Sequence, residues 1–137
     1  MVQIRRIDET EKDYWNKEIE KYEVVHPLNA YGWGGVRSVD KWDPIYLVAE
    51  NEGSICGAMM VLVKKIPYTT LSIMYSPKGP ILNYDDQETL ASLVREARRI
   101  GSDKKAIFLR IDPNIKENIM AGRQDPFEEL GFIHLEQ

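Results

Sequence analysis

The sequence IYLVAENEGSICGAMMVLVKKI, residues 45–66, decides the class of fold. It contains two apolar runs, residues 45–50 and 54–66, on either side of Asn51-Glu52-Gly53. Apolar runs joined by a short turn that contains glycine are typical of a β-hairpin. After Pro67-Tyr68, the run TTLSIMYS at residues 69–76 predicts a third strand. We therefore expect the centre of the chain to form an antiparallel meander of three strands.

Downstream of this meander the apolar spacing becomes helical. Residues three or four positions apart form one stripe and predict an amphipathic helix: Leu90, Leu93, Val94, Ala97 and Ile100. Asp85 and Glu88 have the spacing of a capping box, and Gly101 follows the stripe. These residues should therefore mark the two ends of the helix.

Further elements follow this helix. AIFLRID, residues 106–112, predicts a strand that stops at Pro113, and a less regular helical segment comes after it. PFEELGFIHL, residues 126–135, then predicts a short helix, a glycine stop and a last strand.

The segment before the meander supplies a strand and a helix. VQIRRI, residues 2–7, alternates apolar and polar side chains as a strand does. Thr10 and Asp13 have capping-box spacing, which predicts that a helix starts there. The helix should end near His26-Pro27, and its apolar stripe comprises Trp15, Ile19 and Tyr22.

A second helix is predicted over residues 29–39, where Trp33, Val36 and Val39 lie three apart on one face. The glycines at positions 32, 34 and 35 weaken it, because each costs up to about 1 kcal/mol in a helix interior. We therefore expect this helix either to be distorted or to let another backbone approach closely.

The predicted order is strand, two helices, three strands, helix, strand, helix, strand. This is a mixed α/β arrangement with a mostly antiparallel sheet flanked by helices, the layout of the acyl-CoA N-acyltransferase-like (GNAT-like) fold. A chain of 137 residues is long enough for one such domain. We expect residues 1–137 to form a single GNAT-like unit.

Composition excludes several classes of protein. The chain is 43% hydrophobic and 29% charged, and no apolar run approaches the roughly 20 residues that cross a bilayer. No apolar segment follows the first arginines as it would in a secretory signal, so we expect a cytoplasmic protein. A net charge of −4 argues against non-specific nucleic-acid binding. An anionic ligand would therefore need a local basic patch.

Residues that commonly hold metals are scarce. Cys56 is the only cysteine, which excludes an intramolecular disulfide, and its apolar neighbours favour a small buried side chain. His26 and His134 have no Cys, His or carboxylate partners at metal-ligand spacing. We expect both histidines to be structural and the protein to hold no metal.

The stretch YSPKGPILNY, residues 75–84, lies where acetyltransferases of this fold place a glycine-rich loop that binds the coenzyme A pyrophosphate on backbone amides. Here there is one glycine, and two prolines remove amides that such a loop would use. Instead of a coenzyme A site we expect a rigid corner. Ser76 and Gly79 should be extended or in turns, and Lys78 should be held at the end of the sheet.

Four segments together resemble the first half of the Fem family of bacterial peptidyltransferases: NAYGWGGVRSVDKW, YSPKGPILNYDDQETL, FLRIDPNI and FEELGFIH. These enzymes transfer amino acids from aminoacyl-tRNA to the stem peptide of peptidoglycan precursors and so build the interpeptide bridge. The resemblance implies two GNAT-like subdomains with the substrate in and around the cleft between them. This chain would be the first subdomain and inactive alone, because the family's stem-peptide residues lie in the second.

The resemblance implies a specific role for only a few residues of this chain. In the family a cationic side chain on the second helix contacts the phosphates of the precursor, and Arg37 occupies that place. The planar fork of arginine suits phosphate. Some members have a precursor-binding tyrosine where this sequence has Ile107. No general base is implied for this chain.

We predict a substrate-binding set that joins this arginine to the corner: Arg37, Lys78, Gly79, Trp33, Tyr75 and Arg110. Simpler alternatives stay open for several members. The two cations at 37 and 78 would then be solvated, and Trp33 and Trp42 would be core side chains. Arg110 and Asp112, two apart at a strand end, would pair with each other.

In the complete enzyme the resemblance implies two co-substrates and no other cofactor. These are a lipid-linked or UDP-linked muropeptide precursor and aminoacyl-tRNA, the latter bound mainly by the second subdomain. A free-standing acyl-CoA-dependent N-acetyltransferase and a non-catalytic binding module are the alternatives. The apolar run GFIHL, residues 131–135, has no polar run after it, so the isolated chain is also expected to form homodimers there.

Overall fold

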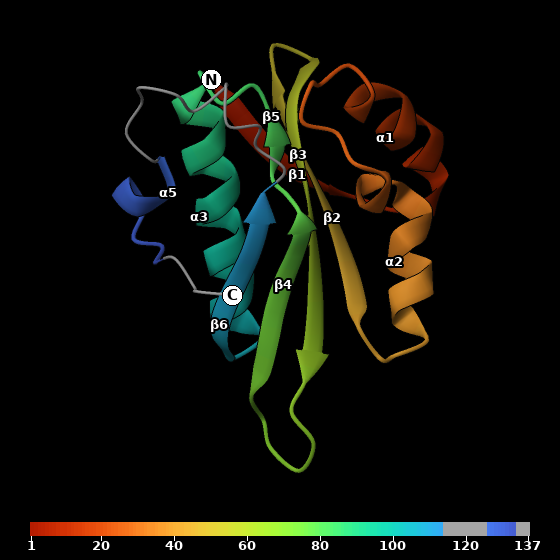
Figure 1. Cartoon of the computed structure of the whole chain (residues 1–137), viewed down its shortest axis with the longest axis vertical. Helices are drawn as coiled ribbons and strands as arrows, with labels where there is room; N and C mark the ends of the chain where they lie inside the picture. Colours follow the sequence, from red (N-terminus) through yellow and green to blue (C-terminus); the bar gives the residue numbers. More distant parts are fainter. Residues whose placement is uncertain (114–125, 134–137) are drawn as a thin grey trace.

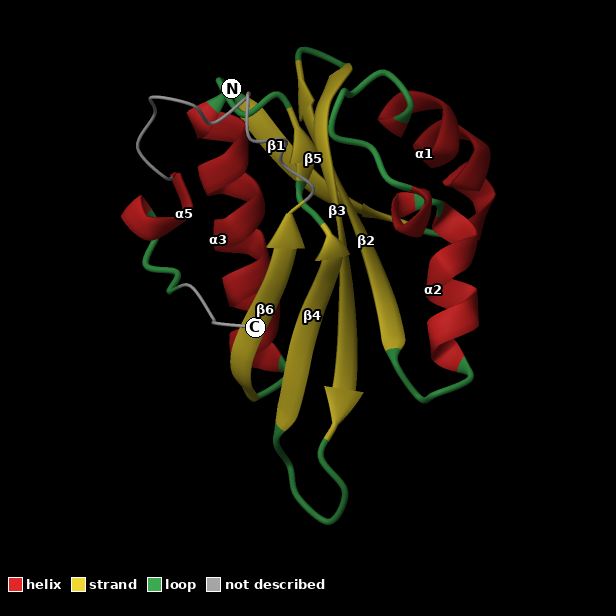
Figure 2. Ribbon diagram, in the orientation of Figure 1, coloured by secondary structure: helices red, strands yellow, loops and turns green. Residues whose placement is uncertain are grey.

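A six-stranded sheet runs through the molecule and carries helices on both faces (Figures 1 and 2). The computed structural model describes residues 1–113 and 126–133. The strands are β1 (Val2–Ile7), β2 (Asp43–Asn51), β3 (Ser54–Lys65), β4 (Ser72–Lys78), β5 (Ile81–Leu82) and β6 (Ala106–Pro113). The α-helices are α1 (Lys12–Ile19), α2 (Tyr31–Ser38), α3 (Gln87–Asp103) and α5 (Pro126–Glu129), and the 3-10 helices are η1 (Glu9–Glu11) and η2 (Pro27–Asn29).

The strands lie in the order β1-β2-β3-β4-β6, and β5 pairs with β3. Neighbours from β1 to β4 are antiparallel, whereas β4 and β6 are parallel. A parallel neighbour needs a crossover, and α3 supplies it between β5 and β6. The predicted mixed α/β class with a mostly antiparallel sheet is confirmed.

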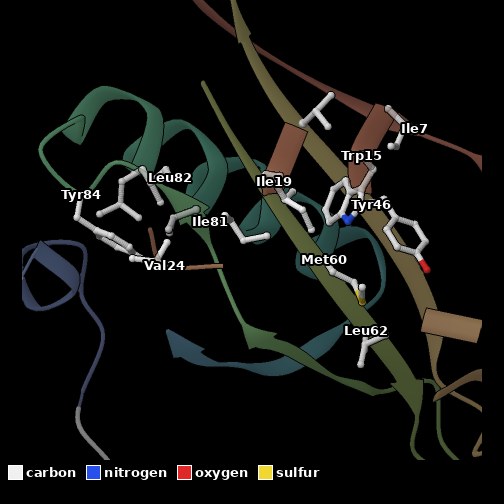
Figure 3. Close-up of a cluster of buried hydrophobic side chains, with 14 of the residues drawn as sticks. Ile7, Trp15, Ile19, Val24, Tyr46, Met60, Leu62, Ile81, Leu82 and Tyr84 are labelled. Carbon is white, nitrogen blue, oxygen red and sulfur yellow. The ribbon is translucent and has the colours of Figure 1, made fainter. Parts of the chain in front are cut away.

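Alternate side chains of the central strands face two different helix layers. Ile45, Leu47 and Met59 pack with residues 93, 97 and 100 of the α3 stripe. All five predicted residues of that stripe are buried. On the other face Tyr46, Met60 and Leu62 pack with Trp15 and Ile19 of α1, as Figure 3 shows. The buried hydrophobic residues thus form two clusters, one that includes Trp15 and Ile19 of α1 and one that includes residues 93, 97 and 100 of α3.

The helix ends differ from the predicted capping boxes. Asp8 caps the 3-10 helix η1, where its carboxylate accepts from the Thr10 amide at 2.9 Å, and α1 starts after Glu11 without a side-chain cap. The predicted box of Thr10 and Asp13 is therefore wrong. At α3 the cap is Asp86 rather than Asp85, and it accepts from the Thr89 amide at 3.1 Å. In each case the residue with extended or irregular backbone just before the helix takes the role.

Two helices also end at residues other than the predicted ones. The first helix ends at Ile19, so Tyr22 lies in the turn beyond it although it packs on the core. Gly101 lies within α3 instead of beyond its end.

Helix α2 does not bury the face that its spacing predicts. Val36 and Val39 are 56% and 84% exposed, and Gly34 is buried in their place. A Cβ at Gly34 would lie 1.9 Å from the Tyr46 hydroxyl, which donates to the Tyr31 carbonyl at 2.6 Å. The glycine does permit a close approach, by a side chain of β2 instead of a backbone.

The end of the chain is described only in part. Gly131 has a φ of +90°, so it ends α5 in the left-handed conformation that the predicted glycine stop implies. Phe132 and Ile133 are not in a strand. The rest of the predicted last strand, His134 and the predicted helical segment within 114–125 lie outside the described residues. Across the described ranges, no helix has the length and apolar character needed to cross a membrane.

Candidate functional site

The proline-bracketed stretch forms a corner where β4 leaves β3. Tyr75 is paired with Leu62 of β3, but residues 76–78 pair only with β6. The chain returns to β3 at Ile81, opposite Ala58. Five residues of the corner, 76–80, therefore lie opposite three residues of β3, 59–61, so the corner is a bulge with two extra residues.

The prolines suit this geometry. Strand β4 extends through Pro77 to Lys78, further than the predicted end at Ser76. A proline is tolerated here because the strand has no β3 partner at that point and needs no amide on that side. Ser76 is extended, as expected. The absence of a side chain at Gly79 leaves room for the Ser76 hydroxyl, because a Cβ at Gly79 would lie 2.6 Å from the Ser76 Oγ.

Asn29, which the sequence did not single out, braces the corner from η2. Its side chain is buried, and its amide donates to the carbonyls of Pro77 at 3.3 Å and Lys78 at 3.1 Å. Its Oδ1 accepts from the His26 amide at 2.7 Å, and its own carbonyl accepts from the Trp15 indole at 2.8 Å. The helical layer thus holds the corner in place.

Lys78 has a positive φ of 52°, and its Nζ lies 3.3 Å from the Asp112 carboxylate on β6. The predicted pairing of Asp112 with Arg110 is therefore wrong. The parallel register explains the difference, because it sets Asp112 beside the corner, opposite Pro77, and sets Arg110 opposite Tyr75.

Tyr75 lies at the centre of the predicted cations. Burial, and then the nearby Asp112 carboxylate, raise the pKa of its phenol above the ordinary value. Positive charges oppose that shift, and they come from three different elements: Arg110, Lys78 and Arg37. All three are members of the predicted set, so the fold gathers them around one ring.

Trp42, in the loop between α2 and β2, completes the group. Its ring lies 6.5 Å from that of Tyr75. The Arg37 guanidinium lies 5.7 Å from the centroid of the Trp42 ring, and the Lys64 ammonium lies 5.6 Å from the same centroid. Two cations therefore make cation–π contacts with one indole ring. Arg37 also approaches Asp40 at 3.7 Å. We call the following residues the Tyr75 cluster: Arg37, Trp42, Lys64, Tyr75, Lys78, Arg110 and Asp112.

Two predicted members lie apart from the cluster. Trp33 packs on the core beside α1, and Gly79 contributes backbone to the corner. Trp42 and Lys64 were not predicted as site residues, and no local signal could have found them, because residues 42, 64 and 75 meet only through the pairing of separate strands. The cations of the Tyr75 cluster come from α2, β3, β4 and β6, so a local basic patch of the kind that an anionic ligand would need is present.

The cluster is suited to binding rather than to proton transfer. Its cations outnumber the carboxylates of Asp40 and Asp112, and two aromatic rings lie among them. Asp112 is engaged with Lys78, and the raised pKa of Tyr75 makes its phenol a poorer proton donor than an ordinary tyrosine. Arginine and lysine so placed favour an anionic group such as phosphate. Among residues 1–113 and 126–133, no three His, Cys or acidic side chains form a metal site.

Solved structures share this fold. A crystal structure of FemX has a TM-score of 0.84 at 22% identity, over 96% of this chain and 32% of FemX. Aminoglycoside 6'-N-acetyltransferase AAC(6')-IG from Acinetobacter haemolyticus has a TM-score of 0.65 at 14% identity, over 98% of this chain and 93% of that enzyme. The predicted GNAT-like fold is confirmed.

Relatives also match in sequence. The lipid II:glycine glycyltransferases of Staphylococcus epidermidis and of Staphylococcus aureus strain bovine RF122 are 26% and 25% identical over 123 residues, 87% of this chain. The chain spans 30% and 29% of their lengths. The model of the FemAB family matches residues 7–132, which include α2, the corner and every member of the Tyr75 cluster. On that match, the chain belongs to the FemAB family.

Proposed function

We propose that this chain is the first subdomain of a Fem-type aminoacyltransferase of peptidoglycan bridge synthesis, and that the Tyr75 cluster binds the diphosphate of the muropeptide precursor. Membership of the FemAB family and the relatives named for lipid II and glycine support the reaction class. The observation that carries the site is the gathering of Arg37, Lys78 and Arg110 around Tyr75 in a chain of net charge −4.

In the proposed reaction the stem-peptide amine attacks the carbonyl carbon of the aminoacyl-tRNA ester. The new C–N bond forms, the C–O bond to the tRNA ribose breaks, and the amine proton leaves as the ribose hydroxyl is restored. This chain would hold the precursor by its phosphates so that the amine is oriented for attack. The tRNA and the transfer step belong mainly to the second subdomain, and the reaction would take place in the cytoplasm.

Calorimetry with the UDP-linked muropeptide tests the site. Arg37→Ala and Lys78→Ala should each weaken binding by roughly tenfold or more, because a charge-assisted hydrogen bond contributes about 1.5–3 kcal/mol. Arg95→Ala is the matched control, since Arg95 is exposed on α3, on the opposite face of the sheet. Equal affinity for all three variants and the parent chain, with folding intact, would refute the assignment.

The acyl-CoA-dependent N-acetyltransferase is the second candidate, because acetyltransferases share the fold over nearly their whole length. The start of α3 speaks against it. Asp86 caps the helix, and its carboxylate also accepts from the Thr89 hydroxyl at 2.5 Å, so negative charge occupies the end where coenzyme A phosphates would bind. Micromolar binding of acetyl-CoA in the same calorimeter would favour this candidate over the first.

The third candidate, a non-catalytic binding module, would bind the precursor in these experiments, but the chain joined to its second subdomain would then transfer no amino acid.

The homodimer remains a prediction. Sedimentation over a wide concentration range tests it, and a chain that stays monomeric at the highest concentration would contradict it.

A further inference from the structure

The turn between β3 and β4, residues 66–71, lies at one end of the long axis of the molecule, beyond the ends of the helices (Figures 1 and 2). At its tip the Tyr68 side chain is fully exposed, at 107% of its reference area, and Leu71 is 40% exposed. Tyr68 and Leu71 therefore give this turn an apolar surface that is exposed to solvent.

The backbone holds Tyr68 outward in a conformation that tyrosine disfavours. Its φ is +65°, at the third position of a turn that Thr69 closes by donating its amide to the Ile66 carbonyl at 3.2 Å. That position usually carries glycine. The Thr69 hydroxyl also donates to the Ile66 carbonyl at 2.8 Å, and Ile66 and Leu71 are bonded across the hairpin at 2.9 Å. The turn is therefore well ordered around a strained, exposed aromatic residue.

Lysines surround the base of this turn. Lys65 is paired with Ser72, and Ser72 bonds back to the next connection, donating its amide to the Lys105 carbonyl at 3.0 Å and its hydroxyl to the Lys104 carbonyl at 2.7 Å. All three lysines are exposed, and none has an ion-pair partner among the described residues. The neighbouring acid, Asp103, is engaged by Arg99 at 3.0 Å.

Two further apolar side chains lie at the start of β6, next to this lysine group. Ile107 and Phe108 are 57% and 50% exposed, and the strand that carries them begins opposite Ser72. We call residues 66–71 together with the three lysines and these two side chains the hairpin tip. It combines a protruding apolar apex with a basic base in a protein of net charge −4.

We propose that the hairpin tip docks on the surface of an anionic lipid bilayer. Tyrosine is favoured at the membrane interface, where its ring meets the acyl boundary and its hydroxyl stays among the headgroups. Lysines near the surface are attracted by anionic lipids, and their charge complements that surface. Aliphatic side chains at the same end favour lipid over RNA, because a surface that binds RNA needs only cations and aromatic rings for stacking.

This membrane contact stands on the hairpin itself and does not depend on the proposed precursor site, although it would place that site well. Tyr75 is three residues along β4 from Ser72, roughly 10 Å at the rise of a strand. A headgroup layer is about 5–8 Å thick. With the tip on the bilayer, the Tyr75 cluster would lie close to the headgroup layer, on the side from which a lipid-linked precursor projects.

Sedimentation with precursor-free vesicles tests the proposal. The full chain should bind vesicles of mixed phosphatidylglycerol and phosphatidylcholine and should bind pure phosphatidylcholine far more weakly. Lys65→Gln with Lys104→Gln and Lys105→Gln should reduce binding to the mixed vesicles by at least about tenfold, and added salt should do the same. The control is Lys12→Gln with Lys17→Gln, both exposed on α1, compared with Lys104→Gln and Lys105→Gln as a double variant that removes the same number of charges; the control should bind as the parent does.

Tyr68→Gly separates membrane binding from folding. Glycine is preferred at this φ, so the variant should unfold at the same temperature or a higher one while its vesicle binding falls severalfold. Equal binding of all variants to mixed vesicles would overturn the proposal. It would equally be overturned if the lysine variant lost affinity for unfractionated tRNA but kept its affinity for vesicles, since that pattern would assign the hairpin tip to RNA.

Discussion

The Asn29 side chain joins the helical layer to the corner, because its oxygen accepts on the helical side and its nitrogen donates to the corner. We predict that Asn29→Leu lowers the free energy of unfolding by about 2–4 kcal/mol, because it leaves the Pro77 and Lys78 carbonyls and the His26 amide without this partner. Urea unfolding measures the loss. The control is Asn83→Ala, an exposed asparagine whose side chain accepts from the Asp85 amide at 3.0 Å, which should cost well under half as much. Equal costs for the two variants would contradict the bracing role.

The glycines of α2 should respond in opposite ways to alanine. At Gly34 a Cβ would lie 1.9 Å from the Tyr46 hydroxyl and 2.8 Å from Pro44 Cβ, so Gly34→Ala should destabilise the protein by about 1–3 kcal/mol or more. At Gly32 and Gly35 nothing lies within 4 Å of the added carbon. There alanine should stabilise the helix by up to about 1 kcal/mol. Thermal unfolding of the three variants side by side checks the difference, and the same sign for all three would show that the close approach has no energetic weight.

On the scale of elements, the start of α3 depends on one carboxylate. Asp86→Ala should cost about 0.5–2 kcal/mol, because it removes the acceptor of both the amide and the hydroxyl of Thr89. Asp86→Ser keeps a capping oxygen and should recover most of the loss. Chemical denaturation gives both values; a serine variant as unstable as the alanine variant would mean that the charge, and not the cap, is what matters.

The elements were predictable to different degrees for physical reasons. The strands around residues 45–66 and the stripe from Leu90 to Ile100 follow from burial periodicity, which is local to the sequence. The caps were displaced by one or a few residues, because several acidic or hydroxyl side chains precede each helix and the backbone geometry selects among them. The outward face of α2 was misjudged, since Val36 and Val39 have the spacing of a buried stripe but β2 contacts Gly34 instead.

The Tyr75 cluster shows the same limit. Arg37, Lys78 and Arg110 were proposed on resemblance and on the stiffness of the corner, but their meeting point at Tyr75 depends on the parallel register of β4 and β6. That register joins segments far apart in the chain, and no spacing within either strand specifies it. The same holds for Trp42 and Lys64, which reach the cluster through the pairing of β2, β3 and β4.

On the scale of the whole molecule, buried tyrosines should set the alkaline limit of stability. Burial raises the pKa of Tyr46 and Tyr84 well above the ordinary value, and burial with the Glu50 contact raises the pKa of Tyr14 to about 12. These groups favour the folded state while they are protonated. The unfolded chain ionises first, near its ordinary pKa of about 10, so stability should be constant below that pH and fall above it.

Urea unfolding at a series of alkaline pH values measures this fall. Tyr84→Phe removes the hydroxyl that donates to the Pro80 carbonyl at 2.6 Å, so it should lower stability at neutral pH and flatten the alkaline loss. A loss as steep as that of the parent chain would mean that Tyr84 does not contribute to it.

In the Tyr75 cluster, the Asp112 carboxylate already pairs with Lys78 and would compete with any anionic ligand for that ammonium. An incoming anion gains the Lys78 ammonium only by replacing a carboxylate that already lies 3.3 Å from it, and it then meets the negative charge that Asp112 still carries. Weak, singly charged anions such as chloride or acetate gain little from this exchange, whereas a ligand with several charged oxygens can engage Lys78, Arg37 and Arg110 together. Under the proposed function, the Asp112 carboxylate would select for multiply charged ligands over abundant small anions.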